Sequence, residues 1–157
     1  MISIIAAVAE NNVIGNKNKI PWHIPEDFKH FKEVTMGHPV LMGKNTFESI
    51  MSMLGKPLPG RTNLVLAKED FSVPEGVQIM HSLKEAFAAY RNEDLFVIGG
   101  ASVYAQTMPF ADTLSITHIA QSPEGDTYFP EIKKDEWRLV SEEPHEGYRF
   151  AVYERTR

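Results

Sequence analysis

The sequence predicts an α/β protein built on one mixed, mostly parallel β-sheet that ends in an antiparallel hairpin. Short aliphatic and β-branched runs alternate with helix-like segments over the first two thirds of the chain, which is typical of a parallel sheet covered on both faces. The last two strand-like runs are separated only by Glu143–Gly147, too few residues for a crossover, so they should pair antiparallel. The 157 residues contain no polar linker and give room for a single domain, 1–157.

Each element rests on a local pattern. The opening run Ile2–Ala9 is apolar and β-branched but too short to span a bilayer, so it is predicted to be a strand. In the first helix, Pro25 suits the first turn, and Phe28, Phe31 and Val34 form one apolar stripe. The predicted strands are Ile2–Ala9, Pro39–Met42, Thr62–Leu66, Val77–Met80, Leu95–Ile98, Thr113–Ile119, Arg138–Glu142 and Tyr148–Arg155, and the predicted helices are Pro25–Met36, Lys44–Met53, Leu83–Tyr90 and Ser102–Met108.

Composition and charge exclude several classes of function. The net charge of −5 disfavours a nucleic-acid or membrane-surface binder, which would show a basic stripe. The absence of cysteine excludes disulfides and thiolate metal sites, and the six histidines show no metal-ligand spacing, so no metal is expected. The first residues lack the basic start of a signal peptide, so a cytoplasmic location is expected.

Two strand ends are followed directly by a glycine turn and a helix. They are Val40–Met42 before Gly43-Lys44-Asn45-Thr46, and Leu95–Ile98 before Gly99-Gly100-Ala101-Ser102. A helix that starts close to its strand leaves backbone N–H groups at the positive end of the helix dipole, where phosphates bind. The pair favours a dinucleotide, although neither junction fits a named motif. His38 stands where a P-loop needs glycine, and Ala101 and Tyr104 break the Rossmann glycine pattern.

Asp27 and Arg61 are the charged residues that the local pattern singles out. Asp27 lies four residues before Phe31, beside the apolar stripe. It either complements the helix N-terminus, which the pattern alone favours, or is a carboxylate of raised pKa in a ligand pocket. Arg61 follows the rigid turn Pro57–Gly60 and is either a solvated surface residue or a bidentate clamp for a carboxylate. The loop Gly15–Trp22 is either a surface connection or a lid.

Together with further short motifs, these residues closely resemble dihydrofolate reductases. The motifs keep family order and cover most of the chain: Ile5-Ala6-Ala7, Val13-Ile14-Gly15, Pro21-Trp22, Asp27, Met42-Gly43, Thr46-Phe47-Glu48-Ser49-Ile50, Pro57-Leu58-Pro59-Gly60-Arg61, Ile98-Gly99-Gly100, Tyr104, Thr117-His118 and Glu124-Gly125-Asp126-Thr127-Tyr128-Phe129-Pro130. The resemblance implies an eight-stranded sheet flanked by four helices. It also implies NADPH-dependent reduction of 7,8-dihydrofolate to 5,6,7,8-tetrahydrofolate, by hydride transfer and protonation of the pterin ring, in a cytoplasmic monomer of one-carbon metabolism that antifolates target.

The resemblance assigns the substrate side of the site. Asp27 would hold the amidine-like edge of the pterin and tune a water-mediated protonation, Thr117 would hydrogen-bond Asp27, and Trp22 would position the water. Arg61 would grip the glutamate α-carboxylate of the substrate, and Ile98 would offer its backbone carbonyl at the pterin end. The walls around the pterin and benzoyl groups would be Ile5, Ala7, Phe28, Phe31, Ile50 and Leu58.

The cofactor side is assigned in the same way. Ala7, Ile14 and Ile20 would surround the nicotinamide, and family members hold Gly99-Gly100 in a cis peptide. The residues around the phosphates would be Gly43, Lys44, Asn45, Thr46, Ile98, Gly99, Gly100, Ala101, Ser102, Val103 and Tyr104. Lys44 would be the main partner of the 2′-phosphate, with Lys68 and His81 as auxiliaries.

Several positions depart from the family pattern. Lys44 replaces a frequent arginine, and Ser102 a basic residue of some members, which predicts a smaller preference for NADPH over NADH. The connection Met51–Lys56 is longer than the usual bacterial one. Glu143–Gly147 is shorter than in many members, so it should not brace the loop Gly15–Trp22 in a state that blocks the nicotinamide pocket.

Two other functions stay open at this point. A reductase of a related heterocycle, such as a riboflavin-pathway intermediate, would share the architecture, but Asp27 with Arg61 favours folate. A folate- or nucleotide-binding module without turnover is disfavoured because Asp27, Trp22 and Thr117 occur together. The absorbance change with NADPH and dihydrofolate distinguishes the three functions.

Overall fold

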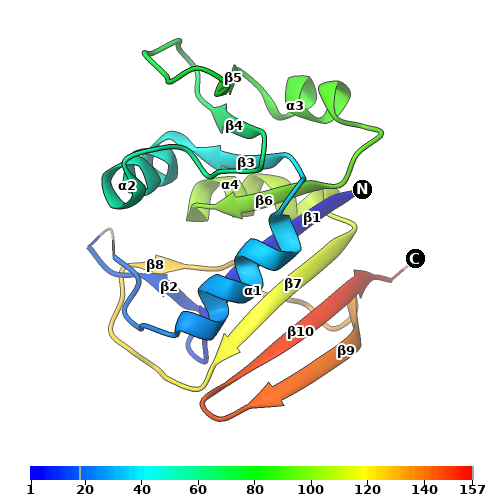
Figure 1. Cartoon of the computed structure of the whole chain (residues 1–157). Helices are drawn as coiled ribbons and strands as arrows, with labels where there is room; N and C mark the ends of the chain where they lie inside the picture. The colour runs from blue at the N-terminus through cyan, green and yellow to red at the C-terminus, as the bar shows by residue number, and fades with distance from the viewer. Residues whose placement is uncertain (18, 157) are drawn as a thin grey trace.

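The computed structural model describes residues 1–17 and 19–156 and is built on an eight-stranded sheet in the order β5-β4-β3-β6-β1-β7-β10-β9 (Figure 1). Its strands are β1 Ile2–Ala9, β3 Val40–Gly43, β4 Asn63–Leu66, β5 Gln78–Met80, β6 Leu95–Gly99, β7 Thr113–Ile119, β9 Trp137–His145 and β10 Tyr148–Arg155. Its helices are α1 Pro25–Thr35, α2 Lys44–Leu54, α3 Leu83–Ala89 and α4 Ala101–Thr107, followed by the 3₁₀ helix η1 Met108–Phe110. Two short strands, β2 Val13–Gly15 and β8 Thr127–Tyr128, form a separate antiparallel pair.

The strand β1 lies inside the sheet and pairs in parallel with two strands that come much later in the chain. Ile2 pairs with Leu95 of β6, and Ala7 pairs with Thr117 of β7. The strands β3, β4 and β5 continue the sheet in parallel beyond β6, whereas β10 runs antiparallel to both β7 and β9. The predicted mixed sheet with a C-terminal antiparallel hairpin is therefore confirmed.

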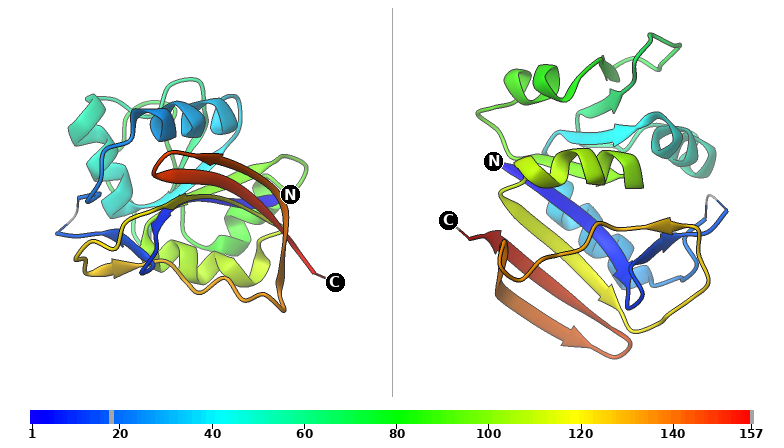
Figure 2. Two further views of the ribbon diagram at one scale, coloured as in Figure 1. Left: turned by 90° about the horizontal axis from the view of Figure 1, so that it is seen from below. Right: turned by 180° about the vertical axis from the view of Figure 1, so that it is seen from behind.

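Helices cover both faces of the parallel part of the sheet. Figure 2 shows α1 and α2 on one face and α3 and α4 on the other. Successive side chains of a strand point to opposite faces, so the buried residues form a cluster on each side. One includes Ile4, Ala6, Val8, Leu41, Leu64, Val97, Val103 and Tyr104, and the other includes Val40, Met42, Phe47, Leu58, Val65 and Val77. In the described part of the chain, no helix is long and apolar enough to cross a membrane.

The structure corrects the sequence predictions in two places. Most boundaries agree within one residue, but β2, β8 and η1 were not predicted. The strand predicted as Arg138–Glu142 runs from Trp137 to His145, so the connection shrinks from Glu143–Gly147 to a two-residue turn, Glu146 and Gly147. The prediction failed because β9 is an edge strand. Every residue after Trp137 is exposed, and its last residues show no alternation of apolar and polar side chains.

Candidate active site

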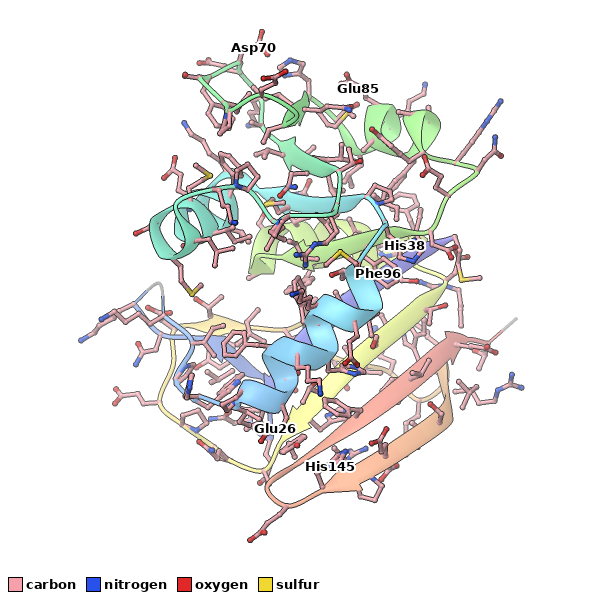
Figure 3. The ribbon with its side chains drawn as sticks, viewed as in Figure 1. Glu26, His38, Asp70, Glu85, Phe96 and His145 are labelled. Carbon is pink, nitrogen blue, oxygen red and sulfur yellow. The ribbon has the colours of Figure 1, made fainter. Side chains whose placement is uncertain are left out.

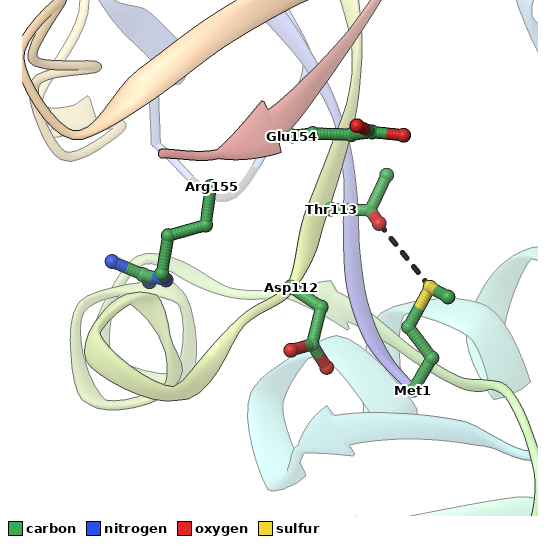
Figure 4. A pocket seen from close by; sticks show the side chains of 5 residues that line it. All are labelled: Met1, Asp112, Thr113, Glu154 and Arg155. Carbon is green, nitrogen blue, oxygen red and sulfur yellow. Dashed lines mark hydrogen bonds between the residues drawn. The ribbon is translucent and has the colours of Figure 1, made fainter. Parts of the chain in front are cut away.

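The two glycine junctions and Thr117 lie at or near the carboxyl ends of the parallel strands. The carboxyl ends of β1, β3, β6 and β7 lie side by side at Ala9, Gly43, Gly99 and Ile119, which is the edge where open α/β sheets bind ligands. A cavity of about 370 Å³ lies near the opposite edge, at the start of β1 and β7. Figure 4 shows the residues that line it, which are Met1, Asp112, Thr113, Glu154 and Arg155. That cavity contains none of the predicted site residues.

A hydrogen bond joins Asp27 of α1 to Thr117 of β7. The Thr117 hydroxyl donates to Asp27 Oδ1 over 2.6 Å, and Thr117 is only 3% exposed. Pro25 starts α1, so Asp27 lies in the first helical turn and faces the sheet. Of the two proposed roles of Asp27, this geometry favours the pocket carboxylate over a purely local helix-terminus interaction, because its partner lies on a different element.

The surroundings of Asp27 favour its protonated form. Burial raises the pKa of this carboxyl above that of an ordinary aspartate, although the hydrogen bond from Thr117 and the nearby His30 both act in the opposite direction. His30 lies on the next turn of α1 and stacks on Phe150 of β10, with ring centroids 3.9 Å apart. Phe150 in turn pairs with Thr117 across the sheet. Asp27 therefore combines a low-polarity setting with a fixed hydroxyl donor, which suits a group that shares protons with a ligand.

The apolar residues predicted to wall the substrate range from buried to exposed. Ile5 and Leu58 are buried, whereas Ala7, Phe31 and Ile50 are half-buried. Phe28, one residue after Asp27, is 45% exposed, and Ile20 of the preceding loop is 51% exposed. Large exposed apolar side chains beside a partly buried carboxylate are typical of a ligand groove. Trp22 is buried against Ala9, Val13 and Ile119, which anchors the end of this loop, and Ile14 is half-buried.

Arg61 is braced at the far end of α1. Its Nε donates to the Pro59 carbonyl over 2.9 Å, and its Nη1 donates to the Thr35 hydroxyl over 3.2 Å. Partial burial lowers the pKa of this guanidinium, which remains strongly basic. The turn is held by the buried Asn63, whose side chain bonds to both backbone groups of Leu58 and to the Arg61 carbonyl. The arrangement suits a carboxylate clamp and shows that Arg61 is more than a solvated surface residue.

The two glycine junctions lie against each other and fit the phosphates of a dinucleotide. A Cβ on Gly43 would lie 3.2 Å from Val103 Cγ2 and 3.9 Å from the Gly99 carbonyl, and a Cβ on Gly100 would lie 3.3 Å from Thr46 Oγ1. Neither α2 nor α4 has a side-chain cap or an acidic residue in its first turn. Their first N–H groups are thus available to an anion, and the lack of side chains lets it approach the backbone.

The strand β6 is irregular where it enters the second junction. Leu41 pairs with Val97, but Met42 pairs with Gly99, so Ile98 is an extra residue in β6. The Gly99-Gly100 peptide that follows is cis, as the resemblance implied. Tyr104 is buried below this junction, and its hydroxyl donates to the Ile5 carbonyl over 2.9 Å. Its side chain therefore supports the junction from the core side, while the bulge removes Ile98 from regular pairing with β3.

The three basic residues predicted for the 2′-phosphate follow neighbouring strands. Lys44 follows β3, His81 follows β5, and Lys68 comes two residues after β4, which lies between them. Lys44 Nζ lies 4.0 Å from Glu48 and 4.7 Å from the centre of the Phe71 ring. His81 forms a 2.9 Å ion pair with Asp70. The described residues contain no cluster of His, Asp or Glu side chains that could hold a metal ion.

The loop Gly15–Trp22, of which Asn18 lies outside the described residues, is tied to the segment before β8. The Lys17 N–H donates to Asp126 Oδ2 over 3.0 Å, and the Asp126 N–H donates to the Gly15 carbonyl over 3.1 Å. Asn16 and Lys19 also bond to each other through both backbone groups. Asp126 and Asn63 are structural contacts of the site to which the sequence patterns assign no role. Asp126 lay within a recognised family motif, which was a usable signal, whereas nothing local distinguished Asn63.

Comparison with known proteins agrees with this geometry. The family model described as "Dihydrofolate reductase" matches residues 1–156. Dihydrofolate reductase of Bacillus subtilis is 42% identical over 164 residues, which cover 99% of this chain and 95% of that protein. Dihydrofolate reductase HdrB of Haloferax volcanii is 42% identical over 159 residues, covering 97% of this chain and 82% of that protein. A solved structure of dihydrofolate reductase from Enterococcus faecalis, complexed with NADP(H) and RAB-propyl, gives a TM-score of 0.88 at 36% identity and covers 100% of this chain and 97% of that one.

Proposed function

Because this chain belongs to the dihydrofolate reductase family and reduces dihydrofolate to tetrahydrofolate with NADPH, we propose that Asp27, Thr117 and Trp22 form the proton-handling end of its active site. The observation that carries the proposal is the 2.6 Å hydrogen bond from Thr117 to Asp27. The full-length family match also decides against the riboflavin-pathway reductase and the module without turnover.

Asp27 binds the pterin and assists its protonation. Oδ1 accepts from Thr117, which fixes the carboxyl and leaves Oδ2 to accept an N–H from the amidine-like edge of the pterin. Burial raises the pKa of Asp27 above that of an ordinary aspartate, and the carboxylate tunes the acidity of a water that Trp22 positions and that protonates the ring. NADPH supplies the hydride when bound. Bulk water is excluded from the ring by the apolar residues Ile5, Ala7, Phe28, Phe31, Ile50 and Leu58. The Ile98 backbone carbonyl accepts a hydrogen bond at the pterin end.

The remaining residues bind the two charged ends. Arg61 holds the glutamate α-carboxylate of dihydrofolate. On the cofactor side, the glycine junctions from Gly43 to Thr46 and from Ile98 to Tyr104 hold the phosphates, and Ala7, Ile14 and Ile20 surround the nicotinamide. Lys44 binds the 2′-phosphate, with Lys68 and His81 as auxiliary partners. The enzyme is proposed to act as a cytoplasmic monomer, and light scattering of the purified chain tests the oligomeric state.

The variant Asp27→Asn tests the assignment of the carboxylate. Turnover at neutral pH should fall by roughly 10²–10⁴, the scale of proton-transfer assistance, and should recover at acidic pH, where solution protons replace the lost donor. The measurement is the pH profile of NADPH oxidation with dihydrofolate. Turnover close to that of the unmodified enzyme at neutral pH would remove Asp27 from the mechanism.

Thermal stability provides the control for folding. The pKa of Asp27 in the folded chain is raised from its ordinary value of 3.8, so its stabilising contribution is present below that value and is lost as the pH rises through the folded pKa. Asp27→Asn, whose amide oxygen still accepts from Thr117, should therefore melt at a higher temperature than the unmodified enzyme at neutral pH. The difference should shrink below pH 3.8.

A further inference from the structure

His81 is held by two groups that only accept hydrogen bonds. Its Nδ1 lies 3.0 Å from the Ala67 carbonyl, and its Nε2 lies 2.9 Å from Asp70 Oδ1. A carbonyl and a carboxylate both require a donor, and a neutral imidazole has only one N–H. The doubly protonated imidazolium is the form of His81 that satisfies both contacts.

The other charged group that faces His81 is also acidic. Glu85, in the first turn of α3, accepts the His81 backbone N–H through Oε2 over 2.9 Å. Figure 3 shows Asp70 and Glu85 at the same end of the molecule. The Ala67 carbonyl, then Asp70 and Glu85, raise the pKa of His81. The neighbouring strand ends are followed by the cations Lys68, two residues after β4, and Lys44, directly after β3.

Consecutive residues of the loop between β4 and β5 hold both His81 and Lys44. Asp70 pairs with His81, and the ring of Phe71 lies 4.7 Å below the Lys44 ammonium. The strands β3, β4 and β5 are adjacent and parallel, so two strand spacings of about 4.8 Å put the backbones of Gly43 and Met80, the residues just before Lys44 and His81, about 10 Å apart. A phosphate monoester between them is within reach of both side chains.

We propose that Asp70 is a positioning residue for the cofactor: it holds His81 as an imidazolium beside Lys44, and thereby contributes to the preference for NADPH over NADH. The proposal rests on the proposed function of Lys44 and His81 at the 2′-phosphate. Asp70 makes no bond to the cofactor in this arrangement. It acts by keeping a cation in place at pH values where a free histidine would have lost its proton.

The consequence is a preference that depends on pH. A phosphate monoester is fully ionised above about pH 7, since its second pKa is about 6. Lysines keep their charge to about pH 10. As the pH rises above 7, loss of the His81 proton is therefore the change that weakens NADPH binding, and NADH binding should stay constant. The expected fall in NADPH affinity is about two- to five-fold, the scale of an exposed charge pair.

The test uses the complete chain without substrate. Ring-nitrogen NMR gives the titration midpoint of His81, and quenching of tryptophan fluorescence gives Kd for NADPH and NADH from pH 7 to 9. The variants are Asp70→Asn, His81→Gln and, as the matched control, Glu69→Gln, which removes the same charge from the neighbouring residue of the loop. Asp70→Asn should lower the His81 midpoint and reduce the ratio of NADPH to NADH affinity at pH 8. His81→Gln should remove the pH dependence, and Glu69→Gln should change neither quantity.

Two results would overturn the proposal. The first is a His81 titration midpoint that is the same in Asp70→Asn and in the unmodified enzyme. The second is a ratio of NADPH to NADH affinity in His81→Gln that matches the unmodified enzyme across the pH range. The variant Lys44→Ala separates this failure from failure of the proposed function. If Lys44→Ala brings the two cofactors together in affinity while His81→Gln has no effect, the 2′-phosphate site stands and the role of Asp70 is wrong. If Lys44→Ala leaves the ratio unchanged, the proposed site itself is wrong.

Discussion

Replacing Arg61 with alanine should separate the glutamate end of the substrate from the pterin end. The guanidinium has five N–H donors; one goes to Pro59 and one to Thr35, so three remain for a carboxylate. The three free donors are the two Nη2 hydrogens and the second Nη1 hydrogen, and they lie on the side of the guanidinium that can bind a carboxylate in a bidentate way. Loss of hydrogen bonds to a charged group costs about 1.5–3 kcal/mol, which corresponds to about a 10- to 150-fold weaker Kd for dihydrofolate.

The assay compares two ligands by fluorescence titration: dihydrofolate and a reduced pterin that lacks the benzoyl-glutamate. Arg61→Ala should weaken the first within the stated range and leave the second almost unchanged. Thr35→Val is the matched control, because it removes the brace on Nη1 and keeps the charge, so its effect should be smaller. An equal loss for both ligands would mean that Arg61 supports the fold of the turn at Asn63 and does not bind the substrate.

Three further outcomes follow from single contacts. Lys44→Ala should reduce the NADPH-to-NADH affinity ratio toward unity, measured by titration at pH 7. The ion pair of Lys44 with Glu48 is exposed and weak, so the ammonium is available to the 2′-phosphate. An unchanged ratio would mean that another residue binds the 2′-phosphate. Burial, and then Arg149, lower the pKa of His118 to about 4 from 6.5, so its contribution to stability is present above pH 6.5 and is lost as the pH falls through 4. His118→Gln should flatten the urea-unfolding free energy across that window, and an unaltered slope would exclude His118. Asp126→Ala should speed hydrogen exchange at the Lys17 amide and weaken NADPH binding, since it removes the acceptor of that N–H; unchanged exchange would mean that Asp126 does not hold the loop Gly15–Trp22.

Strands were predictable where β-branched, aliphatic and aromatic residues gather in one short run. The bounds of β1, β7 and β10 agree with the prediction at both ends. The pair β2 and β8 has three and two residues, too few for any periodicity to be seen. The bulge at Ile98 arises from the shift of register between β3 and β6, so the sequence of either strand alone gives no sign of it.

The site was predictable only through the family resemblance. Asp27 and Thr117 are separated by 90 positions, and the pattern around Asp27 alone favoured a local role at the helix terminus. The contacts of Asp126 with Lys17 and of Asp70 with His81 have the same character, because they depend on how loops meet after the sheet has formed. Residues whose roles depend on contacts between distant segments can be identified only from the three-dimensional structure.

The central place of β1 has a consequence for synthesis on the ribosome. This strand ends at Ala9, but its two partners end at Gly99 and Ile119, about 90 to 110 residues later. At a translation rate of about 5–20 residues per second, the strand waits on the order of 5 to 20 seconds before its partners are complete. During that time the nascent chain carries an eight-residue apolar segment with unpaired edges, which is the kind of segment that aggregates. The strand at the centre of the finished sheet is therefore made first and then waits for both of its neighbours.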